Sequence, residues 1–155
     1  MGRCEISTPA AGTNRAYLPD DAALSARRGG FFMVWIVDDH EDTAELVAHV
    51  LTRHGIAATA FDNGASVLDA LNHDQKPDLV ILDMMMPVMD GIELLRRLRA
   101  SSRSKDIPVV VYSADYTKGR MEEAMSLGAS AYFVKGAVGF DKILKTVGKL
   151  TGNLN

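Results

Sequence analysis

The sequence predicts an α/β fold, in which a parallel sheet of five strands carries helices on both of its faces. Two observations lead to this fold class. Short, nearly continuous apolar runs such as residues 34–37 alternate with longer segments whose apolar residues recur at helical spacing. Strands that are apolar on both sides are typical of a parallel sheet buried between helices. The chain has 155 residues, of which 47% are hydrophobic, so one domain can bury a substantial core.

The five predicted strands share short runs of apolar and β-branched residues. They are expected over residues 34–37, 56–61, 78–82, 107–113 and 131–134. The third of these strands leads straight into Asp83. Pro87 then stops its hydrogen-bond ladder, because proline has no backbone N–H to donate.

The five predicted helices share apolar residues three or four positions apart, which line one face. They are expected over residues 41–54, 63–71, 90–100, 117–127 and 140–150. Asn63 is expected to cap the second helix, and Gly128 to end the fourth. Gly91 is expected to permit tight packing where the third helix begins.

Residues 1–32 differ from the rest of the chain, because they mix Pro, Gly, Ser, Ala and scattered charges without a sustained period. This composition predicts a mobile arm, in which residues 22–28 could form a short helix. Since a second methionine stands at position 33, the arm could also be an overlong start assignment or a cloning scar. The folded domain is expected over residues 33–152, with a tail at residues 153–155 and no second domain.

Composition and charge exclude several classes of function. The net charge of −3 provides no basic patch for nucleic acid. The longest apolar run, residues 31–37, is too short to cross a bilayer, and no signal peptide precedes it. Cys4 is the single cysteine, which fits a reducing compartment and excludes an intramolecular disulfide. We therefore expect a cytoplasmic protein without a nucleic-acid or membrane partner.

Chemically capable side chains follow four of the predicted strands. Asp38 and Asp39 follow the first strand, Asp83 the third, Ser113 ends the fourth, and Lys135 follows the fifth. Each of these alone is more often a solvated cap, a turn or a surface residue. The carboxyl ends of parallel strands share one edge, however, and ligands bind there. Clustered carboxylates repel each other unless a cation intervenes, so we expect Mg²⁺, which prefers oxygen ligands.

Four motifs contain these residues: "VDDHED", "ILDMMMPVMDGIELL", "VVVYSA" and "GASAYFVKG". In these motifs and in the intervals between them, the chain resembles the receiver domains of two-component response regulators. The resemblance covers Met33 to about Leu150. It implies a flavodoxin-like, doubly wound sheet of five strands in the order 2-1-3-4-5, with five helices in a three-layer arrangement. Without an output domain, the chain looks most like single-domain regulators of the chemotaxis or phosphorelay type.

The resemblance implies that Asp83 is a phosphoacceptor, which receives its phosphoryl group from a sensor histidine kinase or a histidine phosphotransfer protein. Asp38, Asp39, Asp83 and the backbone carbonyl of Met85 would bind Mg²⁺, or Mn²⁺ in its place. His40 stands beside the acidic pair and is expected in solvent at a helix start. The chain would be a signalling domain rather than an enzyme, since it would catalyse only its own phosphorylation and dephosphorylation.

The resemblance also implies a switch. Ser113 and Lys135 would bind phosphoryl oxygens, and Tyr132 would move into the space that Ser113 vacates. This movement would alter the face formed by the fourth helix, the fifth strand and the fifth helix, where an unknown downstream protein would bind.

The residue after the lysine departs from the family pattern, because Gly136 replaces the usual proline, which often follows a cis peptide bond. A cis bond before another residue costs about 2.5–4 kcal/mol, so we expect a trans bond or a rearranged loop. Two alternatives stay open. One is a receiver-like interaction module that works without phosphorylation. The other is a phosphatase of the haloacid-dehalogenase type, which would need an acid at position 85, where this chain has Met.

Overall fold

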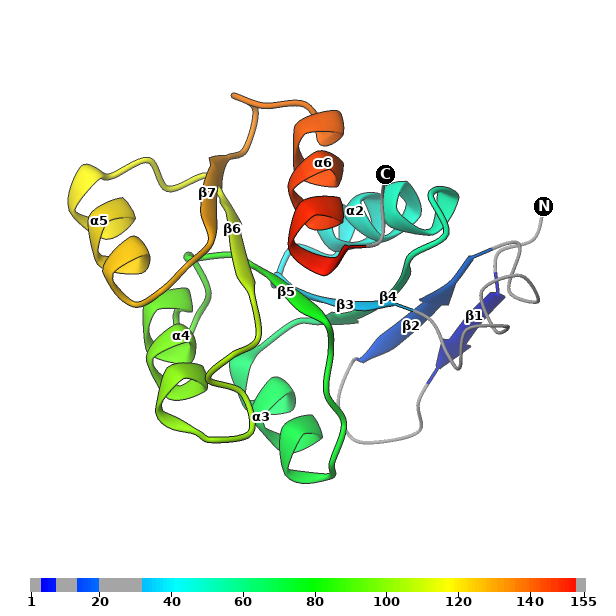
Figure 1. Cartoon of the computed structure of the whole chain (residues 1–155), viewed down its shortest axis with the longest axis horizontal. Coiled ribbons are helices and arrows are strands. Elements are labelled where there is room, and N and C mark those ends of the chain that lie inside the picture. The colour runs from blue at the N-terminus through cyan, green and yellow to red at the C-terminus, as the bar shows by residue number, and fades with distance from the viewer. Residues whose placement is uncertain (1–3, 8–13, 20–31, 153–155) are drawn as a thin grey trace.

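A central sheet organises the chain in the computed structural model, which describes residues 4–7, 14–19 and 32–152 (Figure 1). In chain order its strands are β1 (Cys4–Ser7), β2 (Arg15–Leu18), β3 (Met33–Val37), β4 (Ala57–Phe61), β5 (Leu79–Leu82), β6 (Val109–Ser113) and β7 (Ala131–Val134). Across the sheet they follow the order β1-β2-β4-β3-β5-β6-β7. The five strands from β4 to β7 pair in parallel, which confirms the predicted order 2-1-3-4-5.

Helices cover both faces of this sheet (Figure 1). They are α2 (Glu41–Arg53), α3 (Gly64–Asn72), α4 (Gly91–Ala100), α5 (Lys118–Ser126) and α6 (Phe140–Thr151). One apolar cluster joins α2 and α6 to the sheet, and a second cluster joins α3, α4 and α5 to its other face. The predicted three-layer α/β fold with five helices is therefore confirmed. Among the described helices, none has the length and apolar character needed to span a bilayer.

Strand β5 shows why the strands are apolar on both sides. Val80 and Leu82 belong to the cluster under α3, α4 and α5, whereas Leu79 and Ile81 belong to the cluster under α2 and α6. All four side chains are buried. A polar residue could therefore follow this strand without entering either apolar cluster only at its end, where Asp83 stands.

The sheet has seven strands rather than the predicted five, because β1 and β2 extend it beyond β4. Strand β2 pairs antiparallel with β4, and β1 pairs antiparallel with β2. Tyr17 of β2 is 3% exposed, and its ring meets the ring of His49 edge-on at 5.9 Å. The segments of β1 and β2, CEIS and RAYL, mix charged or polar residues with apolar ones and lack the nearly continuous apolar runs that marked the other strands. The arm predicted for residues 1–32 thus contributes two strands.

Other predictions for the termini lie outside the described residues. These are the short helix over residues 22–28 and the tail at residues 153–155. The mobility of residues 1–32, and whether they belong to the native protein, stay predictions.

Candidate functional site

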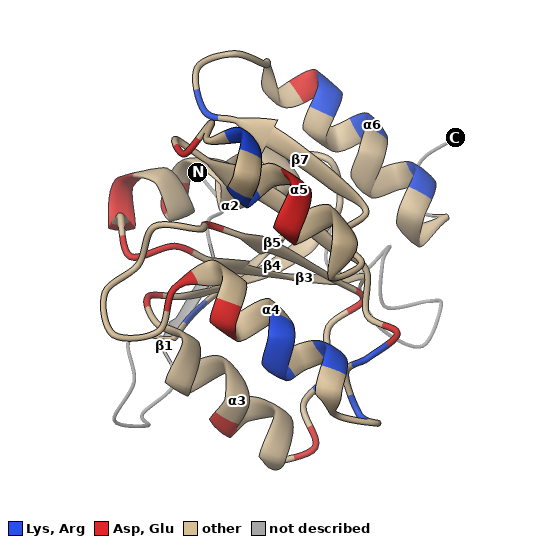
Figure 2. Cartoon of the chain, turned by 90° about the vertical axis from the view of Figure 1, so that its left-hand side faces the viewer, with Lys and Arg blue, Asp and Glu red and all other residues tan. Residues whose placement is uncertain are grey.

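Asp38 and Asp83 stand next to each other because they follow the adjacent parallel strands β3 and β5. The backbone N–H of Asp38 donates to the carbonyl of Phe61 at 3.0 Å, and that of Asp83 to the carbonyl of Val37 at 2.9 Å. The sheet ladder therefore continues into the site and fixes both residues. Their side chains are 4% and 2% exposed. Acidic residues gather on the loops at this end of the sheet, whereas the basic residues of α4 lie towards its other end (Figure 2).

Lys135 reaches both of these carboxylates from the end of β7. Its Nζ lies 2.7 Å from Asp38 Oδ2 and 3.5 Å from Asp83 Oδ2. Burial raises the pKa of Asp38 and the charge of Asp83 adds to this, although the hydrogen bond from Lys135 opposes it. Burial acts to lower the pKa of Lys135, but the hydrogen bond to Asp38 and the attraction of both carboxylates outweigh it, so this pKa is raised. The lysine is therefore held as a cation between two buried acids.

His40 belongs to the same cluster, although its imidazole is 64% exposed. Its Nδ1 lies 3.1 Å from Asp38 Oδ1, 3.2 Å from Asp39 Oδ1 and 3.9 Å from Asp83 Oδ2. Its backbone N–H donates to Asp38 Oδ1 at 2.8 Å. His40 is therefore exposed to solvent, as expected, but its ring also contacts the acidic side chains. Its place directly after the acidic pair was the available signal in the sequence.

The donor atoms of the site suit a metal ion. One ligand atom from each of Asp38, Asp39, His40 and Asp83 can be chosen so that all four lie within 4.8 Å of one another. Asp39 Oδ1 is buried and, although His40 Nδ1 lies 3.2 Å away, it accepts no well-aligned hydrogen bond from the described residues. Leaving a buried carboxylate oxygen without a donor is unfavourable, and a bound cation would remove that penalty. A set dominated by carboxylate oxygens favours Mg²⁺ or Mn²⁺.

Met85 contacts the site through its backbone N–H, which donates to Asp83 Oδ1 at 3.2 Å. This hydrogen bond orients the Asp83 carboxylate. The metal-binding role of the Met85 carbonyl stays a prediction.

Ser113 and Tyr132 both form hydrogen bonds with the backbone of Asp115. The buried Ser113 Oγ accepts a hydrogen bond from the backbone N–H of Asp115 at 3.2 Å. The hydroxyl of Tyr132 donates to the carbonyl of Asp115 at 2.6 Å. Burial raises the pKa of Tyr132, and the charges of Asp115 and Asp83 raise it further. The two predicted switch residues are therefore coupled through the Asp115 backbone.

Gly136 adopts a φ of +84° directly after Lys135. Proline, whose ring fixes φ near −65°, cannot adopt this conformation. No peptide bond among the described residues is cis, which confirms the expected trans bond. The backbone N–H of Ala137 donates to the carbonyl of Val134 at 3.0 Å, which closes a turn. The glycine therefore gives this loop its own course, while Lys135 still reaches both carboxylates.

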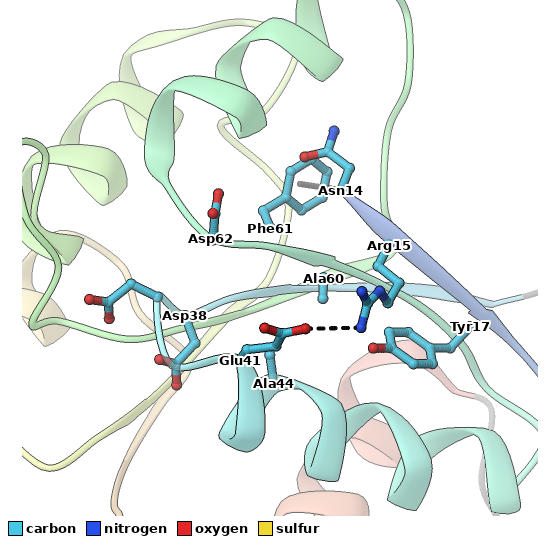
Figure 3. Close-up of a pocket in the computed structure, with 10 residues that line it drawn as sticks. Asn14, Arg15, Tyr17, Asp38, Glu41, Ala44, Ala60, Phe61 and Asp62 are labelled. Carbon is cyan, nitrogen blue, oxygen red and sulfur yellow. Dashed lines mark hydrogen bonds and ion pairs between the residues drawn. The ribbon is translucent and has the colours of Figure 1, made fainter. Parts of the chain in front are cut away.

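A cavity of about 440 Å³ adjoins the acidic residues, between β2 and the start of α2 (Figure 3). Asp38 and Asp39 line it from the site, and Arg15 lines it from β2. Arg15 Nη1 pairs with Glu41 Oε1, in the first turn of α2, at 3.0 Å. Residues of the N-terminal segment thus form one wall of a cavity that reaches the site, which the sequence did not indicate.

Comparisons with known proteins agree with this geometry. The family model of the response regulator receiver domain matches residues 34–147. The two-component response regulator ORR5 of Oryza sativa subsp. japonica is 33% identical over 108 residues, covering 70% of this chain and 81% of that protein. The DNA-binding transcriptional regulator NtrC of Escherichia coli (strain K12) is 34% identical over 103 residues, covering 66% of this chain but 21% of NtrC.

Solved structures give the same result. The chemotaxis protein CheY4 of Vibrio cholerae has a TM-score of 0.70 at 26% identity, covering 78% of this chain and 99% of that one. A response regulator receiver protein from Pseudomonas putida has a TM-score of 0.70 at 29% identity, covering 76% of this chain and 95% of that one. With the strand order, the acidic site and the family model all in agreement, the chain belongs to the response regulator receiver domain family.

Proposed function

We propose that this chain receives a phosphoryl group on Asp83 from a sensor histidine kinase or a histidine phosphotransfer protein, and that the transfer depends on Mg²⁺. One observation carries the proposal: Asp83 is a buried carboxylate whose Oδ2 lies 3.5 Å from Lys135 Nζ, beside the acid on the neighbouring strand. A carboxylate suited to act as a nucleophile, a cation and a second carboxylate suited to bind a metal therefore lie side by side, which supports the proposal. Receiver domains receive phosphoryl groups from histidine kinases, and this geometry provides the parts.

The transfer would form a bond between an Asp83 oxygen and phosphorus and break the bond between phosphorus and the donor imidazole nitrogen. The electron pair of the broken bond stays on the imidazole, which takes up a proton. The N–H of Met85 orients the Asp83 carboxylate. Lys135 would exchange its carboxylate contact for a phosphoryl oxygen, and the Ser113 hydroxyl would donate to another.

Asp38, Asp39 and Asp83 would hold the metal, together with the carbonyl of Met85. A bound Mg²⁺, or Mn²⁺ in its place, would offset the negative charge that gathers on the transferring group. The buried Asp39 Oδ1, which accepts no well-aligned hydrogen bond from the described residues, supports this assignment.

Phosphorylation would then act on the face of α5, β7 and α6. Ser113 turning towards the phosphoryl group would release the N–H of Asp115, whose carbonyl holds Tyr132. The changed face would bind a downstream protein. We further propose a stand-alone signalling domain rather than a turnover enzyme. The interaction module without phosphorylation is not favoured, because Lys135 keeps its carboxylate contacts beside Gly136.

The test is labelling by acetyl phosphate, a small phosphodonor, in the presence of Mg²⁺. The wild-type protein should become labelled and Asp83→Asn should not, and a chelator should prevent labelling of the wild type. Asp74→Asn is the matched control, because Asp74 is exposed, far from the site, and its φ of +64° suits asparagine. Equal labelling of the Asp83→Asn variant would remove Asp83 from the proposed role.

A further inference from the structure

Arg120 connects the two loops that flank Asp83. It lies in the first turn of α5, where its Nη1 is 3.4 Å from Asp90 Oδ2 and its Nε is 3.5 Å from Asp115 Oδ2. Asp90 ends the loop that begins at Asp83, and Asp115 belongs to the loop that follows Ser113. One guanidinium thus bridges the loop of the nucleophile and the loop of the hydroxyl.

Both partners of Arg120 are fixed by other contacts. Asp90 caps α4, since its Oδ1 accepts the N–H of Glu93 at 2.9 Å. Asp115 Oδ1 accepts the N–H of Thr117 at 2.9 Å. Hydrogen bonds from the side chain and the backbone of Thr117, with the charge of Arg120, lower the pKa of Asp115. Arg120 therefore pairs with a well-oriented carboxylate on each side.

Asp115 transmits this contact to the switch. Its backbone N–H donates to Ser113 Oγ, and its carbonyl accepts the hydroxyl of Tyr132. If Ser113 turns towards a phosphoryl oxygen, the Asp115 N–H loses its acceptor. Any shift of the loop then also strains the contacts of the Asp115 side chain with Arg120 and of its carbonyl with Tyr132.

We propose that Arg120 is a positioning residue that holds the unphosphorylated arrangement of the switch. Arg120 acts through Asp115, because it links the side chain of Asp115 to that of Asp90, the cap of α4. The Ser113 loop and Tyr132 therefore move only when the contacts of Arg120 break. The inference rests on the proposed phosphorylation of Asp83. We call Arg120, Asp115 and Asp90 the latch. The latch disfavours the active arrangement, so it sets the binding energy that a phosphoryl group must supply to shift the protein into that arrangement.

The size of the effect follows from the exposure of the contacts. The Arg120 side chain is 42% exposed, and an ion pair of this kind changes an equilibrium by up to about fivefold. Removing the latch raises the population of the active arrangement, and the apparent affinity for any ligand of that arrangement rises by the same factor. An increase of about two- to fivefold is therefore expected.

The experiment compares wild type, Arg120→Ala and Lys118→Ala. Lys118 lies in the same helix with its side chain 91% exposed, and it pairs with Glu122 within α5, so its removal changes charge equally without touching the loops. Beryllofluoride with Mg²⁺ serves as the phosphoryl mimic, and its affinity is measured by calorimetry. Fluorotyrosine labelling reports the state of Tyr132 by ¹⁹F NMR. The bound position is the chemical shift of Tyr132 in the beryllofluoride complex, and a loss of stability alone would not move the signal of the free protein towards it.

Arg120→Ala should bind beryllofluoride about two- to fivefold more tightly, and its free Tyr132 signal should shift towards the bound position, while Lys118→Ala matches wild type. Equal or weaker binding by Arg120→Ala, with the free Tyr132 signal unmoved, would overturn the latch but leave the proposed function standing. Failure of the wild type itself to bind beryllofluoride would overturn both.

Discussion

Replacing Tyr17 by alanine tests whether the N-terminal strands are part of the folded domain. Tyr17 is 3% exposed and belongs to the apolar cluster beneath α2, where its ring meets that of His49. Ala58 and Ala60 on the neighbouring strand are also buried in that cluster. A truncated side chain at position 17 would leave a cavity over these small residues, so we expect the Tyr17→Ala variant to lose stability.

The size of the loss follows from the buried area. A buried aromatic side chain removes about 150 Å² or more from water, which at about 25 cal/mol per Å² corresponds to about 4 kcal/mol. Residual compactness of the unfolded chain reduces such figures by up to about 40%. The free energy of unfolding should therefore fall by about 2–4 kcal/mol.

Urea unfolding followed by the fluorescence of Trp35 measures this change. Trp35 is buried against Phe61, with the ring centroids 4.8 Å apart, so its emission reports the loss of the core. Tyr116→Ala is the matched control, because Tyr116 is 77% exposed and its removal should change stability by no more than about 0.5 kcal/mol. If Tyr17→Ala proved as stable as this control, the packing of β2 on the sheet would be refuted.

Two further predictions concern the site itself. Because burial raises the pKa of Asp38, the folded protein binds more protons than the unfolded chain between about pH 4 and that raised pKa, so stability falls as pH rises there. Urea titrations in the presence of a chelator at several pH values should show this fall. The Asp38→Asn variant should show a smaller fall, and its free energy of unfolding at pH 7 should be higher by about 1 kcal/mol. If the variant had the same pH profile as the wild type, the prediction would be contradicted. A Cβ on Gly91 would overlap the backbone oxygen of Asp83 and lie 2.7 Å from Met84 Cα, so Gly91→Ala should lose about 2 kcal/mol or more. Gly119→Ala, in open space on α5, should gain up to about 1 kcal/mol, and similar values for the two variants would count against the packing at Gly91.

The sheet and the site could be predicted because the same residues encode both. A strand buried on both faces must be apolar until its end, so Asp83 after "VIL" marks both the end of β5 and a carboxylate placed at the ligand edge. Parallel pairing then brings Asp38, Asp83 and Lys135 within hydrogen-bond or ion-pair distance. The expected trans bond before Gly136 followed from energy alone.

Other features depend on tertiary contacts that leave no local pattern. Strand β2 is four residues long and acquires its burial from α2 and β4. Arg99 lies in the basic last turn of α4, yet it donates to the carbonyls of Leu127 and Gly128, and burial lowers its pKa. No sequence pattern indicated a role for Arg120, because its partners Asp90 and Asp115 belong to two loops that only the fold brings together.

The site concentrates unfavourable conformations and charges on loops above a fully buried sheet. Val88, in the loop after Asp83, is a β-branched residue at a φ of +69° and is fully exposed, a conformation that costs about 1–3 kcal/mol. Asp38 and Asp83 are buried as neighbours, with Lys135 as the cation that contacts both. The strands beneath are buried between two layers of helices, so under the proposed function the binding of a cation or a phosphoryl group would act on these charges through the loops. In the proposed switch, the contacts of Asp115 would convert small shifts of those loops into a change at Tyr132.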